Sequence, residues 1–411
     1  MKLLRARLVV TMEEGSPPIE DGGVLVAGGK VVAAGPFHEI AARAGRTPER
    51  LDLGETVLLP GLINAHCHLD YTAMRGKLPP QASFSRWIGE INALKASWSD
   101  DDYLASITEG FAELRRYGTS TVVNLAAFPH LLARLPQPFP VRTWWVPELI
   151  DLRDPAHAGQ LLDAALATFA GRPPFGGYGV SPHALYTASP GLYRLCAQAA
   201  TRDPALRLTT HLAESCDEEA MFREGTGPLA TFLAGLGRPM DDCGRRSPFA
   251  QALATGLISP EWLLAHVNTF DKEDARLMAA TGAPWFVAHC PKSHAYFRHP
   301  AFPWQRLEAA GAIISIGTDS LASNTNLNLF EELRAAQKTV PGLTSETLLR
   351  TVTVNPARAL GQQGRLGVIA PGAFADLLAL PYTGSSSDVY NAIVAHQPDH
   401  PWMMHHATIA P

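Results

Sequence analysis

The sequence predicts an α/β protein, a (β/α)8 TIM barrel with a small β-sandwich domain built from both ends of the chain. Three observations predict this fold. Eight short apolar stretches between about residues 58 and 360 alternate with helical stretches, as in a parallel sheet with crossover helices. Both ends of the chain contain short strands punctuated by Gly-Gly or turn residues. The 411 residues suffice for one large domain and one small domain.

The first segment, residues 1–57, contains the strand-like stretches LLRARLVVT, GVLVAGGKVVAAG and ETVLLPG. Two basic residues interrupt its apolar start, so we expect a first strand there and not a signal peptide. Residues 361–411 return to strand and turn, with GRLGVIAPGAFADLLALPY. We therefore expect residues 1–57 and 361–411 to form the β-sandwich domain, and residues 58–360 to form the barrel.

Within the barrel, the expected strands are, in order, GLINAH, STVVNLAA, VRTWWVPEL, GYGVSPH, LRLTTHLAES, EWLLAHVNT, APWFVAHCP and AIISIGTDS. The clearest helix is Asp102–Tyr117, where Leu104, Ile107, Phe111 and Leu114 form one apolar stripe and Gly118 marks the end. Between the fifth and sixth strands, Gly225–Arg246 is the one long irregular stretch. Loops of this length in a compact domain usually have a function.

Composition excludes several classes of function. The net charge is −5, so no basic surface points to nucleic acid as a partner. No apolar run is long enough to span a bilayer, which predicts no membrane partner. The five cysteines are scattered and odd in number, as expected for free thiols in the cytoplasm. We expect a cytoplasmic enzyme with a small-molecule substrate, assembled as a homodimer.

Polar residues occupy the carboxyl ends of the expected strands, where barrels of this kind place their chemistry. They are, in chain order, His66, His68, His183, His211, Glu214, His266, His289, Cys290 and Asp319. In a strand, residues i and i+2 point to the same side, so His66 and His68 can reach one point. We expect these two histidines, His211 and Asp319 to converge on one divalent metal. Neutral imidazoles and a carboxylate suit Zn²⁺, with Fe²⁺ or Mn²⁺ as alternatives.

Structural explanations compete with several of these assignments. A single histidine at a strand end is usually structural and one H-x-H motif is weak, so the argument depends on the joint pattern. Asp319 can cap a helix, since TDS precedes a helical run, and Glu214 can be a first-turn helix acid. His289 and Cys290 are the members most readily assigned to structure. The fourth strand has no lysine to bridge two ions, which predicts a single metal.

These motifs resemble the amidohydrolase superfamily, specifically its mononuclear aminohydrolase branch. That branch contains guanine, cytosine, S-adenosylhomocysteine and aminodeoxyfutalosine deaminases and the triazine chlorohydrolases. The matching stretches cover nearly the whole chain in order: PGLINAHCHLD, SPHALYTAS, THLAESCDE, LLAHVNTF, VAHCPKSHAYF, GTDSLASNTNLNLFEEL and VNPARALGQQGRLGVIAPGAFADLLAL.

The resemblance implies a cyclic amidine deaminase, a hydrolase of carbon–nitrogen bonds other than peptide bonds. It implies that Glu214 shuttles protons, that Asp319 and His266 act on the attacking hydroxide, and that His183 contacts the substrate. Two departures from the family pattern occur. His294 stands where relatives often have Asn, and Arg86 precedes Trp87 where nucleoside-binding relatives often have an acid.

Arg86 suits a substrate with a carboxylate, since a guanidinium pairs with a carboxylate through two hydrogen bonds. The candidates for substrate binding are therefore His183, Arg86, Trp87 and His294. Among purine nucleoside-type compounds, the sharpest candidate is aminodeoxyfutalosine of a menaquinone route, which carries an adenine and a benzoate. Arg86 can instead be a solvated helix residue paired with Glu90.

Other functions stay open at this point. The substrate can be another base or nucleoside, such as guanine, cytosine, S-adenosylhomocysteine or methylthioadenosine. The same site can support a triazine-type chlorohydrolase. A more distant alternative is a catalytically silent assembly protein that retains the barrel.

Overall fold

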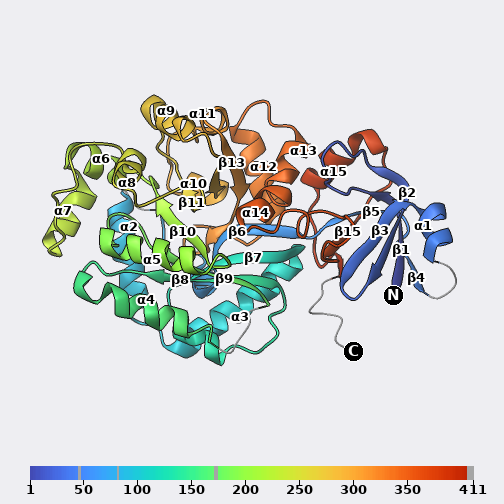
Figure 1. The fold of residues 1–411 in the computed structure, drawn as a ribbon, viewed down its shortest axis with the longest axis horizontal. Helices are drawn as coiled ribbons and strands as arrows, with labels where there is room; N and C mark the ends of the chain where they lie inside the picture. The colour runs from blue at the N-terminus through green and yellow to red at the C-terminus, as the bar shows by residue number, and fades with distance from the viewer. Residues whose placement is uncertain (45–47, 81–82, 171–174, 405–411) are drawn as a thin grey trace.

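Two β-sheets form the framework of the molecule: a parallel sheet in the centre of Figure 1 and a mixed sheet at its right. The computed structural model describes residues 1–44, 48–80, 83–170 and 175–404. The parallel sheet contains β6 (Leu62–His68), β7 (Thr119–Ala126), β8 (Arg142–Leu149), β9 (Gly176–Pro182), β10 (Arg207–Leu212), β11 (Leu263–His266), β12 (Trp285–His289), β13 (Ala312–Ile316) and β14 (Asp319–Ser320). The first seven expected stretches match β6 to β12 in order, and the eighth contains both β13 and β14. From β6 to β13, neighbours in the chain are neighbours in the sheet.

The two ends of this row meet through β14. The short strand follows β13 directly and pairs with β6, with Asp319 opposite Cys67. The backbone N–H of Thr318 donates to the carbonyl of His66 at 3.0 Å. Gly317 permits this approach, since a Cβ there would lie 2.6 Å from the same carbonyl oxygen. The order and closure of the strands are consistent with a TIM-like barrel.

Most of the helices lie around the parallel sheet, as Figure 1 shows. They are α2 (Phe84–Lys95), α3 (Asp100–Arg116), α4 (Ala158–Ala167), α5 (Pro190–Arg202), α6 (Cys216–Glu224), α7 (Pro228–Gly235), α8 (Pro248–Ala254), α9 (Lys272–Ala280), α10 (Pro291–Tyr296), α11 (Trp304–Ala309), α12 (Leu329–Thr339), α13 (Ser345–Arg350) and α14 (Val354–Ala359), with the 3-10 turns η1 (Leu69–Met74), η2 (Pro129–Arg134) and η3 (Pro155–His157).

The helix expected over Asp102–Tyr117 is α3, and it begins two residues earlier. Ser99 accepts a hydrogen bond from the N–H of Asp102, whose side chain accepts one from the N–H of Ser99. This capping box satisfies two N–H groups that the first turn leaves free. At the other end, Gly118 takes the left-handed conformation (φ 83°) that terminates helices.

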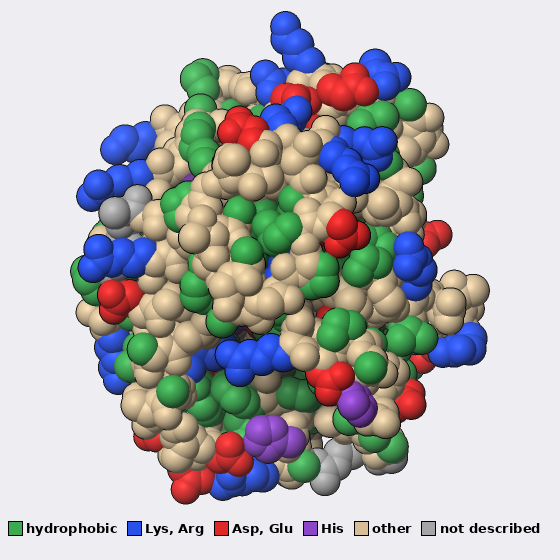
Figure 2. All heavy atoms as spheres, turned by 90° about the vertical axis from the view of Figure 1, so that its left-hand side faces the viewer, with side chains coloured by type: hydrophobic (Ala, Val, Ile, Leu, Met, Phe, Trp, Pro, Cys, Tyr) green, Lys and Arg blue, Asp and Glu red, His purple; other side chains and the backbone are tan. Residues whose placement is uncertain are grey.

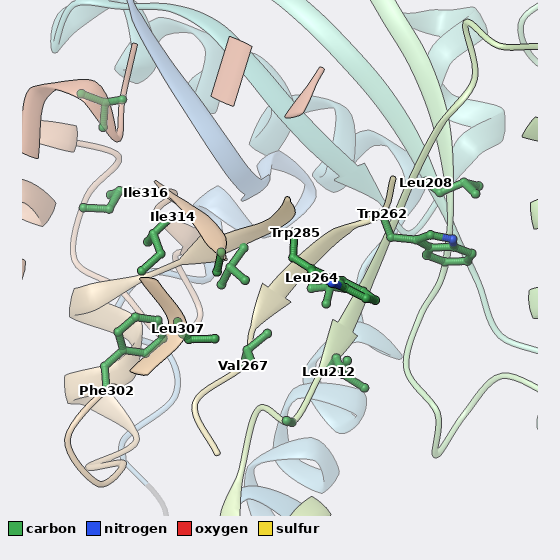
Figure 3. Close-up of a cluster of buried hydrophobic side chains, with 14 of the residues drawn as sticks. Leu208, Leu212, Trp262, Leu264, Val267, Trp285, Phe302, Leu307, Ile314 and Ile316 are labelled. Carbon is green, nitrogen blue, oxygen red and sulfur yellow. The ribbon is translucent and has the colours of Figure 1, made fainter. Parts of the chain in front are cut away.

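Along each strand, side chains alternate between the face that packs against the helices and the opposite face of the sheet. On β10, Leu208 and Leu212 face the surrounding helices, and His211 faces the opposite side. Figure 3 shows these leucines with Leu264, Trp285 and Ile314 of the next strands and Leu307 of α11. Trp285 and Leu307 are fully buried. Burial of such side chains contributes roughly 1.5–3 kcal/mol each, which holds the strands in register around the site.

The mixed sheet joins the two ends of the chain. Its strands are β1 (Lys2–Val9), β2 (Ile19–Ala27), β3 (Lys30–Pro36), β4 (Glu49–Asp52), β5 (Thr56–Pro60), β15 (Leu377–Pro381) and β16 (Trp402–Met404). They run in the order β16-β15-β5-β1-β2-β3, with β4 paired to β1. Helix α1 (Phe37–Ala44) covers one face, where Ile40 and Ala44 pack on Leu3 and Leu25.

The described residues of this region form one sheet, so the two stacked sheets of the expected sandwich are not confirmed. β5 continues to Pro60, past residue 57, and residues 405–411 lie outside the described part of the chain. After the turn η4 (Ser386–Asp388), α15 (Val389–Ala395) is a helix in a segment expected to be strands. It packs against α12 and α13 beside the parallel sheet.

Gly225–Arg246 is not an irregular loop as expected, because it contains α7. Pro228 starts this helix, and the left-handed Gly225 ends α6 just before it. Leu229 and Leu233 are buried and anchor α7 to the core. Among the described helices, none is long and apolar enough to cross a membrane.

A buried ion pair connects the two sheets. Nε of Arg142, at the start of β8, lies 2.9 Å from Oδ2 of Asp376, which precedes β15. Both residues are 5% exposed. The Arg142 guanidinium also covers the ring of Phe374, 3.9 Å from its centroid. The mixed sheet is thereby attached at the amino-terminal side of β8, opposite the strand end that bears the site.

Replacing Arg142 by Met is expected to destabilise the protein by about 3–5 kcal/mol, because it removes the charge that compensates a buried carboxylate. The drop in Tm in a thermal denaturation experiment measures this effect. Arg116→Met is the matched control, since Arg116 and Asp399 form an exposed pair 2.6 Å apart. An Arg142 variant as stable as this control would show that the buried pair does not hold the two sheets together.

Candidate metal centre and active site

Four side chains that the sequence assigned to a metal converge at the carboxyl ends of the parallel strands. His66 and His68 come from β6, His211 from β10 and Asp319 from β14. Nε2 of His68 lies 3.4 Å from Nε2 of His211. Oδ1 of Asp319 lies 3.7 Å from Nε2 of His66 and 3.6 Å from Nε2 of His68. All four residues are at most 6% exposed, so their donor atoms face one small dry space.

The backbone around this space is held in unusual conformations. Asp319 (φ 59°), His266 (φ 74°) and Ala213 (φ 51°) all lie in the left-handed region, although none is glycine. Such residues cost about 1–3 kcal/mol each and persist where the surrounding structure imposes them, often at functional sites. Here the conformations turn the chain at the ends of β10 and β11 and at the start of β14, where the polar side chains meet.

Protonation states make the cluster suitable for a cation. Burial lowers the pKa of His68, His211 and His266, so neutral imidazoles with free lone pairs are favoured. Burial alone would raise the pKa of Asp319, but the neighbouring imidazoles of His66, His266 and His68 hold the pKa below the usual range. Ser293 Oγ and the N–H of Ser320 both donate to this carboxylate, at 2.6 and 2.7 Å.

The cluster therefore fits a divalent metal. Both ring nitrogens of His66 are buried and have no hydrogen-bond partner among the described residues. A cation would satisfy the nitrogen that faces the cluster, and three imidazoles with one carboxylate are ligands typical of zinc. The donor atoms of His66, His211 and His266 lie within 4.8 Å of one another, and so do those of Glu214, His266 and Asp319.

Glu214 lies at the edge of the cluster, where the sequence placed it. Its Oε1 is 3.6 Å from Nε2 of His266. Burial raises the pKa of Glu214 well above that of an ordinary glutamate, and the negative charges of Asp319 and Glu218 raise it further. A carboxyl group with a raised pKa can both take up and release a proton near neutral pH.

Two side chains that the sequence analysis did not single out hold the Glu214 backbone. The Glu218 carboxylate accepts hydrogen bonds from the N–H groups of Ala213 (3.1 Å) and Glu214 (2.8 Å). Asn268 Nδ2 donates to the carbonyl of Glu214 at 2.9 Å. The Glu218 contacts are local, four and five residues apart in the chain, whereas the Asn268 contact joins the segment after β11 to the segment after β10 and forms only when these strands pair.

Glu148, at the carboxyl end of β8, is a further acid beside the cluster that the analysis missed. Its carboxylate oxygens lie 3.6 Å from Nδ1 of His68 and 3.6 Å from Nδ1 of His211. Burial raises its pKa, whereas His211 and Lys95 lower it. The signal was present in the sequence, since Glu148 ends the third expected strand as His211 and His266 end later ones.

A cavity of about 790 Å³ opens over the cluster. His68, His183, His211, Glu214 and Asp319 form its floor, and its walls are mostly apolar and aromatic, with Tyr71, Phe84, Trp87, Ile91, Phe128, Tyr186, Phe232 and Leu236. Figure 2 views the molecule from the side of α7, and its lower half shows a hollow bordered by hydrophobic and basic side chains. The expected irregular segment after β10 thus contributes a wall through α7.

Two of the four residues expected to bind substrate line this cavity. His183 follows β9, and its Nδ1 lies 2.7 Å from Oγ1 of Thr187, which orients the ring. Trp87 lines the wall and stacks on Phe84 with ring centroids 5.9 Å apart.

Arg86 and His294 are not among the described residues that line the cavity. Arg86 is exposed, because α2 turns Trp87, Ile91 and Lys95 towards the cavity and places Arg86 on another face. The position of Arg86 therefore agrees with the alternative of a solvated helix residue and not with a substrate-binding one, and Lys95 is the cation that α2 presents to the cavity. Nδ1 and Nε2 of His294 lie 3.0 Å from Asn268 and 2.8 Å from the Pro300 carbonyl, so His294 supports the chain behind the site.

His289 and Cys290 take structural places, as expected. The His289 ring stacks on Phe302 with centroids 3.7 Å apart, and both His289 and Cys290 are buried outside the cavity lining of the described residues.

The fold and the site define a class of protein, and comparison with known proteins identifies its family. The model of the amidohydrolase family matches residues 57–400, and the chain belongs to this family. A 5-methylthioadenosine/S-adenosylhomocysteine deaminase of Syntrophobacter fumaroxidans is 30% identical over 423 residues, which cover 95% of this chain and 91% of the relative. The protein is a hydrolase acting on carbon–nitrogen bonds, of the aminohydrolase branch.

Solved structures show the same architecture. Aminofutalosine deaminase of Helicobacter pylori, in complex with methylthio-coformycin, superposes with a TM-score of 0.84 at 20% identity, covering 99% of both chains. An adenosine deaminase of Xanthomonas campestris with bound zinc superposes with a TM-score of 0.78 at 25% identity, covering 100% of this chain and 94% of the other. Both likenesses extend over essentially the whole chain, including the mixed sheet.

His211→Ala is expected to lose the metal, because it removes a donor from the centre of the cluster. Elemental analysis of the purified protein should find about one divalent ion per chain in the wild type and much less in the variant. His294→Ala is the matched control and should retain the ion. Two ions per chain in the wild type would contradict the single site.

Arg86→Ala and Trp87→Ala should differ although the residues are adjacent. The exposed Arg86 is expected to leave kcat/KM within about twofold. Loss of the Trp87 ring removes apolar contact area from the cavity wall and is expected to lower kcat/KM about tenfold or more. Equal losses of kcat/KM in both variants, measured with one substrate and at equal Tm, would show that Arg86 contributes to substrate binding.

Proposed function

We propose that the protein is a zinc-dependent hydrolytic deaminase of a purine nucleoside-type compound. The observation that carries this proposal is the placement of a buried proton-shuttling acid, Glu214, beside a three-histidine, one-carboxylate cluster at the floor of a cavity. A metal held by His66, His68, His211 and Asp319 would supply the positive charge that makes water nucleophilic at neutral pH.

Separate side chains then transfer the protons and orient the attacking water. The Glu214 carboxylate takes a proton from the attacking water and delivers it to a ring nitrogen next to the carbon under attack. Protonation of that nitrogen makes the neighbouring carbon more electrophilic, and addition of the water oxygen to this carbon ends the aromatic stabilisation of the ring. Asp319 accepts a hydrogen bond from the water, and Nε2 of His266, 3.6 Å from Glu214, orients it from the other side. The exocyclic amino group then takes up the second proton of the water and leaves as ammonia.

The cavity favours a substrate with an extended, largely apolar group beyond the base. Ile150, Phe232 and Leu236 are exposed apolar residues, and all three line the cavity. We therefore rank 5-methylthioadenosine and S-adenosylhomocysteine first, which agrees with the names of the curated relatives. His183 and Trp87 are the residues proposed to contact the substrate.

Aminodeoxyfutalosine is the second candidate. Its benzoate no longer has the partner proposed for it, because Arg86 lies outside the cavity lining. Lys95 and Arg153 are the cations that line the cavity among the described residues, so either can take that role. Guanine and cytosine deamination and triazine dechlorination use the same proton chemistry in part and belong in the same screen. A silent assembly protein has no use for a buried shuttle acid.

Several wider expectations remain proposals. We propose that the parallel sheet closes as a complete (β/α)8 barrel over residues 58–360, and that residues 1–57 and 361–411 form the smaller domain. A homodimer in the cytoplasm, without nucleic-acid or membrane partners, completes this proposal.

The experiment is a screen for ammonia release with the zinc-loaded protein. 5-Methylthioadenosine, S-adenosylhomocysteine, aminodeoxyfutalosine, adenosine, guanine, cytosine and a chlorotriazine are compared at equal concentration, with chloride release measured for the last. Deamination of a purine nucleoside with the highest kcat/KM supports the proposal. Preference for a free base or for dechlorination would refute it.

Glu214→Gln is expected to lower turnover at least about 10²-fold, because the amide retains the size of the side chain and cannot carry the proton. Zinc content should stay at the wild-type level, which separates loss of the shuttle from loss of the metal. Near-normal turnover of Glu214→Gln on the best substrate would assign the proton transfers to another group.

A further inference from the structure

A buried histidine nitrogen of the cluster and a buried carboxylate lie close together, and each has an atom without a hydrogen-bond partner among the described residues. Nδ1 of His68 and Oε1 of Glu148 are both buried without a hydrogen-bond partner among the described residues. Oε2 of the same carboxylate lies 3.6 Å from this Nδ1, and His68 and Glu148 have only 6% and 7% of their side chains exposed. Both side chains are nearly buried, so an unmade hydrogen bond here is costly.

His211 provides the comparison within the same site. Its Nδ1 lies 3.0 Å from the carbonyl of His183, which can only accept, so the proton of the neutral ring sits on Nδ1. Nε2 of His211 is thereby left as a lone-pair donor towards the cluster. His68 faces the cluster through Nε2 as well, but no backbone carbonyl reaches its Nδ1 among the described residues. Among the described residues, the acceptor that lies beside that atom is the Glu148 carboxylate.

We propose that Glu148 is a positioning residue of the metal centre, which accepts a hydrogen bond from Nδ1–H of His68 and so presents Nε2 to the ion. This inference rests on the proposed metal-dependent function. A carboxylate behind a histidine ligand fixes the tautomer and the ring orientation and makes the ligand nitrogen more basic. Ion binding would draw the ring of His68 and the carboxylate into line.

The surroundings of Glu148 include a cation and a second buried acid. Lys95 of α2 lies over the ring of Tyr71 with Nζ 5.1 Å from the centroid; burial raises the pKa of Glu148, and the charge of Lys95 counteracts this by stabilising its anionic form. Asp70, fully buried in the same region, accepts a hydrogen bond from the N–H of Ala127 at 2.8 Å. The Glu148 carboxylate lies beside two histidine Nδ1 atoms, on the side of both rings away from their shared Nε2 contact.

The experiment measures zinc release from the purified, zinc-loaded protein into a chromogenic chelator. Glu148→Leu removes the acceptor at similar size and should release zinc about 10–100-fold faster than the wild type. Glu148→Gln retains a carbonyl acceptor and should recover part of this loss. Asp70→Asn is the matched control, since it neutralises a buried acid near Lys95 without touching a histidine ligand, and it should release zinc at the wild-type rate. Tm is measured for each variant to exclude general unfolding.

Three results would overturn the proposal. Wild-type zinc release by Glu148→Leu would show that His68 does not need this acceptor. An increase in KM with unchanged zinc release would make Glu148 a substrate-binding residue. A wild type with two ions, one of which Glu148→Gln loses, would make it a direct ligand. A wild-type protein that binds no divalent ion at all would instead refute the proposed function, so the two failures are distinguishable.

Discussion

The pairing of β14 with β6 is the contact on which the site depends. It places Asp319 opposite Cys67, between the two histidines of β6, although more than two hundred residues separate them along the chain. The pairing requires Gly317, because any side chain there would collide with the backbone of His66. The same two-residue strand follows the last strand of the row and pairs with the first, so one pairing links the ends of the sheet and brings Asp319 to the histidines of β6.

The pairing of β14 with β6 brings many polar groups into a small buried space. Six of the residues in this space, His66, His68, His211, Glu214, His266 and Asp319, are at most 7% exposed. Such a cluster would be costly without a cation, since neutral imidazoles face one another and two acids lie close together. The left-handed backbone at Asp319 and His266 adds to the cost. A bound metal would offset both costs.

The walls of the cavity above this centre determine which substrates can bind. The walls come from α2, α7 and the segment after β8, and none of these belongs to the parallel sheet. Helix α2 is an example, because two adjacent residues on it have different surroundings. Trp87 faces the cavity and its neighbour Arg86 faces solvent, because consecutive residues on a helix point about 100° apart. Substrate selection therefore lies with loops and helices that the strand pattern does not specify.

The sequence by itself predicted the parallel strands, the helix that stops at Gly118, and the polar residues that the structure brings together as a candidate metal centre. These follow from local rules: apolar periodicity, turn residues, and polar side chains at strand ends, where a parallel sheet gathers them. Tertiary structure decided the rest. It turned Arg86 and His294 away from the cavity, formed α7 and α15 where irregular chain or strands were expected, and made one mixed sheet at the ends of the chain. It also brought Glu148, Lys95 and Glu218 to the site. The orientation of a side chain on a helix and the partner of a buried acid depend on elements distant in the chain, and their contacts exist only once β6 to β14 have closed.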